Sequence, residues 1–396
     1  MKILLISPHY PQRLYFFAKA LKERGFFVVG MGDTPWAQLN DDLKWALSDY
    51  IQIDLSCYHT CGVIDTVRYA PLHQTVAYLI GKHGRFDYIE SLNEYWLPLE
   101  AQLRLDFNVP GPKPVDMEHM TRKSLMKQHF VAAGAKVARG EILRDRAHLL
   151  AFAAEVGDFI VKPDVGVGAS DTRRIRSKEA AERFWETRDP NVCYFLEAFV
   201  PEEGRELISF DGIADGTGEV IFYCVHSYCS GIMEVVEGNP LTYFNYLNAE
   251  LPEALVALGK RTVEAFGLRK RFFHIEYFRI GETYWGLEIN ARPPGVLTLD
   301  LMNHAKGLNV WDLYARMLTG EKVKVDFARD WTCAYNGRLN RLPYHHSHEE
   351  IMARYPENIG HAMPMDSVVM GDFAYVVVAP DHETRHEVMD FINARA

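Results

Sequence analysis

The first part of the chain alternates compact apolar runs with amphipathic stretches. One such stretch, 13–24, has apolar residues at helical spacing, and Gly25 ends it. Compact apolar runs are typical of strands buried on both faces of a parallel sheet. They lie at residues 2–7, 26–31, 50–53 and 86–91. Strands that alternate with helices predict a doubly wound α/β lobe, which ends near 109–114, where three prolines and a glycine indicate a linker.

Beyond this lobe, paired strands replace the strict alternation. A helix is expected over 117–133, and the strand 158–163 runs into a loop of small residues. Residues 205–211 and 219–227 alternate like antiparallel strands around the turn signal Asp-Gly-Thr-Gly. The tail mixes strands with a last helix over 382–394. This pattern predicts an α+β region after the α/β lobe.

The segment 272–292 combines a predicted hairpin with polar residues at every second position. Glu276 and Glu288 lie on its two strands, so strand pairing could bring them side by side. Two adjacent carboxylates repel each other unless a cation lies between them. With the amide oxygen of Asn290 they form a set of hard ligands, which suits Mg²⁺ or Mn²⁺ better than Zn²⁺. The alternative is a surface hairpin whose charges are solvated.

Arg292 lies on the same strand face as Asn290, where a guanidinium could stabilise a transferring phosphoryl oxygen. Apolar Ile289 and Ala291 alternate with these polar residues, which favours a site over a solvated hairpin. Farther upstream, Lys162 ends an apolar strand just before the loop 164–171, which contains two glycines. A strand-end cation followed by flexible backbone is typical of a phosphate-binding site, although no GxxxxGK[ST] motif is present.

Composition narrows the classes of function. The chain has 396 residues, more than one ordinary core would hold, and its net charge is −10. Nucleic-acid-binding proteins usually present a basic face, so we expect no nucleic-acid partner. No apolar stretch approaches the roughly eighteen residues that a membrane helix needs, so we expect a cytoplasmic protein. A GxGxxG motif is absent after the first strand, which speaks against a Rossmann cofactor site.

The order of these motifs resembles that of the ATP-grasp superfamily, which includes biotin carboxylase, carbamoyl phosphate synthetase, D-alanine–D-alanine ligase and the bacterial L-amino-acid ligases. The matching segments are Lys123, Val161-Lys162-Pro163, Leu196-Glu197-Ala198-Phe199-Val200, Gly204-Arg205-Glu206, His274-Ile275-Glu276 and Glu288-Ile289-Asn290-Ala291-Arg292. The resemblance implies an N-terminal α/β domain over 1–113, an ATP-grasp subdomain with the glycine loop over 114–196, a second subdomain with the metal site over 197–320, and a small C-terminal α+β extension over 321–396.

The resemblance also implies roles for single residues. Lys123 and Lys162 would bind the phosphates of ATP, together with Gly166, Gly168 and Ser170 of the glycine loop. The hinge residues Glu197, Ala198 and Val200 would line the adenine edge, and the acid Glu206 would bind the ribose hydroxyls. The metal ligands would be Glu276, Glu288 and Asn290, and Arg292 would be the catalytic arginine.

Members of the superfamily usually activate a carboxylate as an acyl phosphate, which an amine or another nucleophile then attacks. Pro293-Pro294-Gly295 stands where biotin carboxylase would have a Gln-x-Glu stretch, which favours a carboxylate–amine ligase similar to the amino-acid ligases. We therefore expect small-molecule carboxylate and amine substrates, and the resemblance allows a homodimer. The alternatives are an ATP-binding sensor or scaffold and a small-molecule kinase.

Residues that would contact the substrate are harder to predict. Many relatives place substrate contacts in the segment that holds Ser230, Gly231 and Glu234 here. His9 follows the first predicted strand and Glu94 follows the fourth. Loops at the carboxyl ends of parallel strands face ligands in open α/β sheets, so both side chains are candidates.

Overall fold

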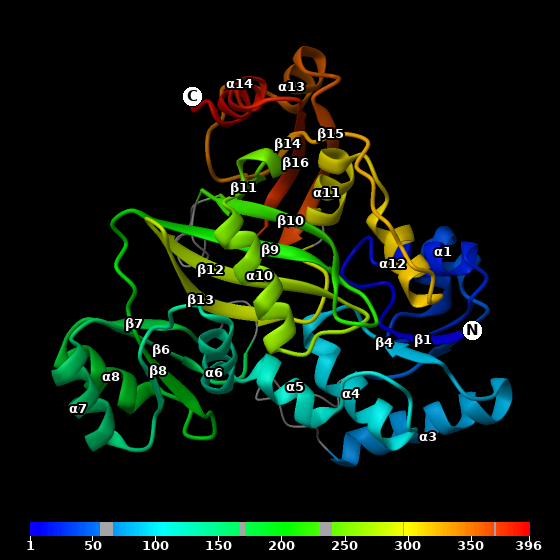
Figure 1. The fold of residues 1–396 in the computed structure, drawn as a ribbon, viewed down its shortest axis with the longest axis horizontal. Helices are drawn as coiled ribbons and strands as arrows, with labels where there is room; N and C mark the ends of the chain where they lie inside the picture. Colours follow the sequence, from blue (N-terminus) through cyan, green and yellow to red (C-terminus); the bar gives the residue numbers. More distant parts are fainter. Residues whose placement is uncertain (56–65, 167–170, 230–239, 296, 368–369) are drawn as a thin grey trace.

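The protein is seen in a computed structural model that describes residues 1–55, 66–166, 171–229, 240–295, 297–367 and 370–396. A large antiparallel sheet forms the centre, a parallel α/β lobe lies beside it, and a small antiparallel sheet faces one edge (Figure 1). None of the helices in these ranges has both the length and the apolar character that crossing a membrane requires.

The N-terminal lobe is a parallel four-stranded sheet with the order β3-β2-β1-β4. Its elements are β1 (Lys2–Ile6), α1 (Tyr15–Glu23), β2 (Phe27–Gly32), η1 (Trp36–Gln38), α2 (Asp41–Ala46), β3 (Asp49–Gln52), α3 (Thr66–His83), β4 (Tyr88–Glu90), η2 (Glu94–Trp96) and α4 (Leu97–Asp106). Ile3 and Leu5 of β1 share a core with α1 and α2, whereas Leu4 and Ile6 share another with α3 and α4. Helices therefore cover both faces, and the predicted doubly wound lobe is confirmed.

A small antiparallel sheet, with the order β5-β8-β6-β7, follows the first lobe. Its strands are β5 (Gly140–Ile142), β6 (Phe159–Pro163), β7 (Arg173–Ile175) and β8 (Tyr194–Ala198), and its helices are α7 (Arg146–Val156) and α8 (Lys178–Thr187). Both helices pack on one face, where Phe159 and Leu196 are buried with Phe152 and Phe184. The other face is left to line a cleft.

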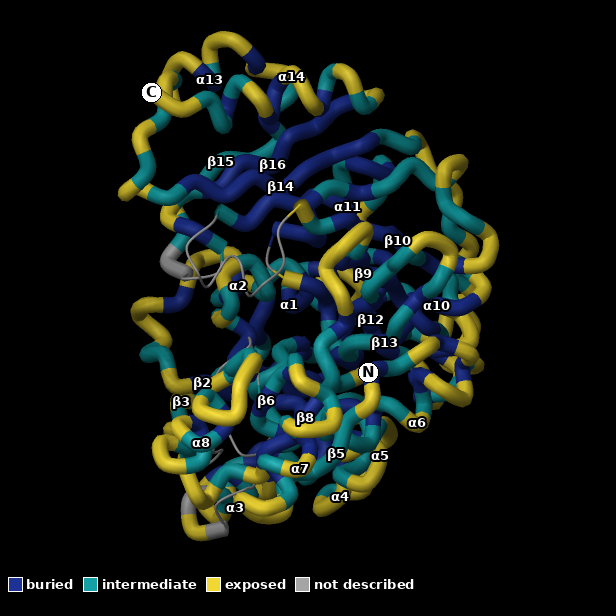
Figure 2. The backbone as a smooth tube through the Cα atoms, turned by 90° about the vertical axis from the view of Figure 1, so that its left-hand side faces the viewer, coloured by how far each residue is buried: buried dark blue, intermediate teal, exposed yellow. Residues whose placement is uncertain are grey.

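The large sheet has eight strands in the order β13-β12-β9-β10-β11-β14-β16-β15, and all its pairs are antiparallel. The strands are β9 (Arg205–Ala214), β10 (Val220–Tyr228), β11 (Thr242–Asn245), β12 (Arg271–Ile280), β13 (Thr283–Asn290), β14 (Thr332–Arg338), β15 (Ile359–Ser367) and β16 (Gly371–Ala379). The accompanying helices are η3 (Asn248–Glu250), α10 (Glu253–Ala265), α11 (Thr298–Lys306), α12 (Val310–Leu318), α13 (His348–Arg354) and α14 (His382–Asn393). Because β14 pairs with β11, the tail after residue 320 continues this sheet. Helices α13 and α14 cover one of its faces there (Figure 2).

The single helix expected over 117–133 is wrong in one respect, because the chain forms two helices, α5 (Pro114–Thr121) and α6 (Lys123–Ala133). Arg122 between them is extended, with φ −91° and ψ 115°. Asp164, from the loop after β6, supplies the reason. Its carboxylate accepts the Ser124 N–H at 2.8 Å, and its carbonyl accepts the Lys123 N–H at 2.9 Å. A carboxylate at a helix N-terminus satisfies free N–H groups and favours a new start there.

Candidate active site

A cleft of about 950 Å³ lies between the small sheet and the β9–β12–β13 edge of the large sheet. The small sheet contributes Lys162 and Glu197, the large sheet contributes Glu276, Glu288 and Asn290, and Lys123 comes from α6. Predicted site residues that line the cleft are Glu94, Lys123, Lys162, Gly166, Glu197, Ala198, Val200, Glu276, Glu288, Asn290 and Arg292. The structure therefore brings together residues that are far apart in the sequence.

Lys162 and Glu197 form a buried ion pair on the cleft face of the small sheet. The Lys162 Nζ lies 2.6 Å from Glu197 Oε2, and Lys127 of α6 pairs with the other carboxylate oxygen. Burial opposes the charge on Glu197, but the two lysines outweigh it and lower its pKa to about 2. Burial likewise opposes the charge on Lys162, and the surrounding carboxylates, chiefly Glu197, raise its pKa. The predicted phosphate-binding lysine is therefore held charged.

Lys123 is the first residue of α6 and points into the same end of the cleft. Its Nζ donates to the Gly166 carbonyl at 3.1 Å and lies 3.7 Å from Glu288 Oε1. The side chain thus connects the base of the glycine loop with the acidic strand opposite. Gly168 and Ser170, the other predicted loop residues, lie outside the described residues.

The hairpin β12–β13 places the predicted metal ligands opposite one another. Glu276 is the direct pairing partner of Glu288. The register then shifts, and Tyr277 pairs with Gly286, so Leu287 is an extra residue that forms a bulge. The bulge also exchanges the faces of β13. Tyr284, at an even position before the bulge, and Ile289, at an odd position after it, both pack in the same core.

The donor set fits a small hard cation. Glu276, Glu288 and Asn290 offer carboxylate and amide oxygens, which are the ligands that Mg²⁺ takes from proteins. Within the described ranges, no three His, Cys, Asp or Glu side chains are close enough to hold a metal ion by themselves. An incomplete protein shell is normal for Mg²⁺, which keeps several water molecules and completes its sphere with substrate phosphates.

Behind Glu276, two buried histidines share one buried carboxylate. Asp211 of β9 lies 2.5 Å from His274 Nδ1 and 2.6 Å from His226 Nδ1, while His274 Nε2 lies 3.3 Å from Glu276. Burial disfavours the imidazolium, but Asp211 outweighs it and raises the pKa of His274 to about 10. The protonated ring can therefore balance the charge of Glu276 from the protein side.

Arg292 leaves the end of β13 and meets the N-terminal lobe. Its Nη2 donates to Glu94 Oε2 at 2.6 Å, and Glu94 is the first residue of η2, which follows the loop after β4. A second cavity of about 290 Å³ adjoins the cleft here, and Glu94, His274, Glu276 and Arg292 line both spaces. Its remaining wall is largely apolar and includes Leu92, Tyr228, Leu241, Tyr243, Leu299 and Met370, and Gln12, Arg13, Asn93 and Thr298 add polar groups to it.

Other predicted residues lie elsewhere. Glu206 is not among the residues that line the cleft; its carboxylate accepts a hydrogen bond from Ser227 Oγ at 2.6 Å. His9 lines neither cavity; its Nε2 lies 3.2 Å from Asp33, and burial lowers its pKa. Ser230, Gly231 and Glu234 fall outside the described residues.

Sequence reasoning missed a group of residues at the hinge. Arg174 of β7 lies 3.3 Å above the Phe199 ring and pairs with Glu202 at 2.5 Å, and all three line the cleft. Arg205 also lines it, within 4.4 Å of the Phe278 ring centroid. Two of these residues had a signal in the sequence, since Phe199 and Arg205 lie within matching segments. Arg174 lies on a short strand that no pattern predicted.

Two facing sheets, with Lys162 on one and the paired acids on the other, and with Lys123 at the start of α6, match the ATP-grasp arrangement that the motifs resemble. A relative found by sequence supports this match. An L-arginine-specific L-amino acid ligase of Bacillus subtilis is 24% identical over 330 residues, which are 79% of this chain and 74% of that protein. None of the family models compared with the chain matches it.

Solved structures share the fold. An L-amino acid ligase from Bacillus licheniformis superposes with a TM-score of 0.70 at 15% identity, over 99% of this chain and 98% of that one. The biotin carboxylase domain of the Hydrogenobacter thermophilus 2-oxoglutarate carboxylase, in complex with MgADP, ADP and bicarbonate, also reaches 0.70, at 16% identity over 99% and 89%. The neighbours in sequence and in structure are thus ATP-grasp ligases, and the predicted resemblance and fold are confirmed.

Proposed function

We propose that the protein is an ATP- and Mg²⁺-dependent ligase that joins a small carboxylic acid to an amine and releases ADP and phosphate. One observation carries the proposal: Lys123 and Lys162 meet Glu276, Glu288 and Arg292 in a single cleft. A relative that is an L-amino acid ligase supports the reaction, and a biotin carboxylase neighbour solved with MgADP supports the cofactors. Amino acids are the first acids and amines to test.

The residues suit an acyl-phosphate route. The lysines would hold the nucleotide phosphates while a carboxylate oxygen of the acid attacks the γ-phosphorus and ADP leaves. Mg²⁺, held by Glu276, Glu288 and Asn290, would neutralise charge on the phosphate oxygens. Arg292 would donate to the transferring phosphoryl oxygens. The amine nitrogen would then attack the acyl carbon, and phosphate would leave.

The adjoining cavity is our candidate for the acid. It opens beside Arg292, so a carboxylate at its mouth would lie next to the phosphoryl group. Its apolar wall of leucine, tyrosine and methionine side chains suits an acid with an apolar or aromatic body. Glu94, at the same mouth, offers a carboxylate to an ammonium group. We therefore expect amino acids with apolar side chains to be used better than charged ones.

An ADP-release screen over single acids and acid–amine pairs tests the function, with hydroxylamine as a trap. A hydroxamate indicates the acyl phosphate of a ligase, whereas ADP release without one indicates a kinase. Nucleotide binding without any ADP release across the panel would point to the sensor or scaffold.

The variant Glu288→Gln should abolish turnover and weaken the dependence on Mg²⁺, because it removes one charged ligand from the metal set. Glu282→Gln, on the exposed turn of the same hairpin, is the matched control and should behave like the wild type. Near-normal activity of Glu288→Gln would exclude the metal assignment.

We also propose that the protein works in the cytoplasm on small molecules and binds no nucleic acid, which its net charge of −10 supports. A homodimer stays a prediction, and sedimentation equilibrium would measure the mass directly.

A further inference from the structure

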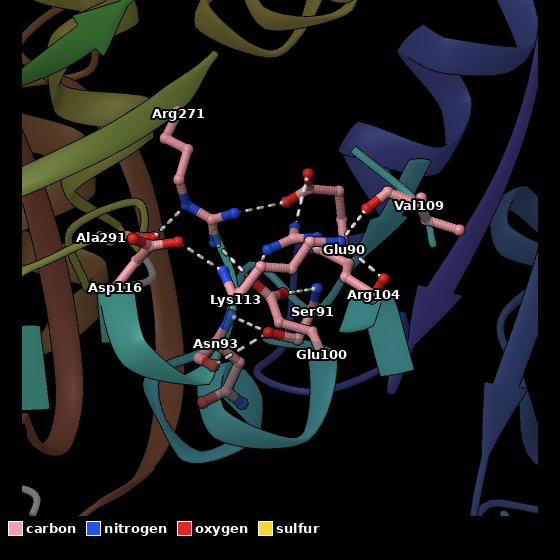
Figure 3. A network of polar contacts seen from close by, with 10 residues as sticks. All are labelled: Glu90, Ser91, Asn93, Glu100, Arg104, Val109, Lys113, Asp116, Arg271 and Ala291. Carbon is pink, nitrogen blue, oxygen red and sulfur yellow. Dashed lines mark hydrogen bonds and ion pairs between the residues drawn. The ribbon is translucent and has the colours of Figure 1, made fainter. Parts of the chain in front are cut away.

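Four charged residues form a closed ring between the N-terminal lobe and the large sheet (Figure 3). Glu90, Glu100, Arg104 and Arg271 have exposed fractions between 0% and 5%. Arg104 lies 2.8 Å from Glu90 and 3.0 Å from Glu100. Arg271, the first residue of β12, lies 3.3 Å from Glu90 and 2.5 Å from Glu100. Each guanidinium thus bridges both carboxylates.

The burial of four charged side chains in one cluster requires a physical explanation. Desolvating charges is costly, and apolar side chains of similar volume often stabilise a core as well or better. A buried polar cluster can instead fix the geometry of the segments that it joins, because it tolerates few alternative arrangements. The segments joined here are those that carry Glu94 and Arg292.

On one side, the ring holds the loop after β4. Glu100 Oε2 accepts the Ser91 N–H at 2.6 Å. The next residue, Leu92, has φ +54°, a conformation that costs a leucine free energy and persists only where its surroundings enforce it. The loop then reaches Glu94, the partner of Arg292. The Glu100 contact is thus one of the constraints on the loop that presents Glu94.

On the other side, the ring holds the end of β13. The Arg271 Nε–H donates to the Ala291 carbonyl at 3.1 Å, directly before Arg292 (Figure 3). With the bond between Arg292 and Glu94, these contacts form a closed circuit that passes through Glu100. Both ends of the Arg292–Glu94 pair are therefore tied to the same ring.

We propose that Arg271 is a positioning residue, which together with Glu100 sets the direction in which Arg292 points its guanidinium. The inference rests on the proposed function, since it concerns the arginine that would stabilise the transferring phosphoryl group. Arg271 itself does not line the nucleotide cleft, so its effect on the reaction would pass through Ala291 and Arg292.

The test compares Arg271→Lys with Arg104→Lys. Both replace a planar fork by a single ammonium in the same ring, but only Arg271 contacts the Ala291 carbonyl. Arg271→Lys should lower kcat roughly tenfold to hundredfold, as misplacement of a reacting group does, and leave the Kd for ADP with Mg²⁺ unchanged. Arg104→Lys should lose similar thermal stability yet keep a much larger share of kcat. Equal losses of kcat, or a matching rise in Kd for Arg271→Lys, would overturn the proposal.

Hydrogen exchange provides a readout that needs no turnover. Amides of residues 91–94 and 290–292 should exchange faster in Arg271→Lys than in Arg104→Lys, and equal exchange would contradict the positioning role. If the wild type releases no ADP with any substrate pair, the proposed function fails, while this comparison still decides whether the ring orders the two segments. If Arg271→Lys does not fold, Glu100→Gln replaces it, with the same expected results and the same contradicting ones.

Discussion

Glu197 is the side chain on which the charge balance of the cleft depends. It is buried, and Lys162 and Lys127 surround its carboxylate. Its pKa of about 2 lies below the ordinary value of 4.5, so it stabilises the folded state. A lowered carboxylate pKa contributes fully above the ordinary value, and the contribution is lost as the pH falls from about 4.5 to about 2.

The variant Glu197→Gln should therefore be less stable than the wild type at pH 7, by roughly 3 kcal/mol. The gap between the two proteins should shrink below pH 4.5, because the wild type then loses the ionised carboxylate as well. Urea unfolding at a series of pH values measures both curves. A gap that does not change with pH would mean that the carboxylate contributes through its shape rather than its charge.

Individual site residues could be predicted where the chemistry follows a local pattern. The period-two order of Glu288, Asn290 and Arg292 on one strand is such a pattern, and Ile289 is fully buried on the opposite face. The partner of Arg292 could not be predicted in this way. Glu94 reaches it because two lobes pack together, and no local rule of sequence encodes that packing.

Among the helices and strands, α6 shows how one side chain sets a boundary. Asp164 lies on the loop after β6, yet it caps α6 and so determines where Lys123 points. Helix periodicity continues through Arg122, so the pattern alone predicted one helix rather than two. The bulge at Leu287 escaped prediction similarly, because an extra residue in one strand shows only when its partner strand is known.

Replacing Asp164 by Ala should cost about 1–2 kcal/mol of stability, as the loss of an N-cap does. It should also weaken nucleotide binding about tenfold, equivalent to about 1.4 kcal/mol. The reason is that the start of α6, which carries Lys123, is no longer fixed by the cap. The matched control is Asp145→Ala, which removes the cap of α7, where Asp145 accepts the His148 N–H at 2.8 Å. Urea unfolding and ADP titration measure the two effects. Equal loss of affinity in both variants would contradict the local role of Asp164.

Across the whole molecule, the large sheet unites segments that motif matching separates. The resemblance ends near residue 320, so the sequence predicts a small C-terminal extension over 321–396. In the structure, Tyr243 of β11 pairs with Tyr335 of β14, and their rings stack at 5.0 Å. Asn245 adds a side-chain bond to the Cys333 N–H at 2.7 Å. The tail therefore completes the hydrophobic core in which Leu241 and Tyr243 are buried. Tyr243 also lines the cavity proposed for the acid.

This continuity predicts that the large sheet and its tail unfold together. Removal of 321–396 would leave β11 paired with β10 alone, as an edge strand, and would expose Leu241, Leu297 and Leu301, so the shortened chain should aggregate. In calorimetry of the full chain, ADP with Mg²⁺ at a hundred times its Kd should stabilise by about 2.7 kcal/mol. Because the cleft and the tail share one sheet, the ligand should shift the transition that includes the tail. Two results would contradict this prediction and show that the tail is an independent unit. One is a separate transition for residues 321–396 that the ligand does not shift. The other is a shortened chain that stays soluble and binds ADP.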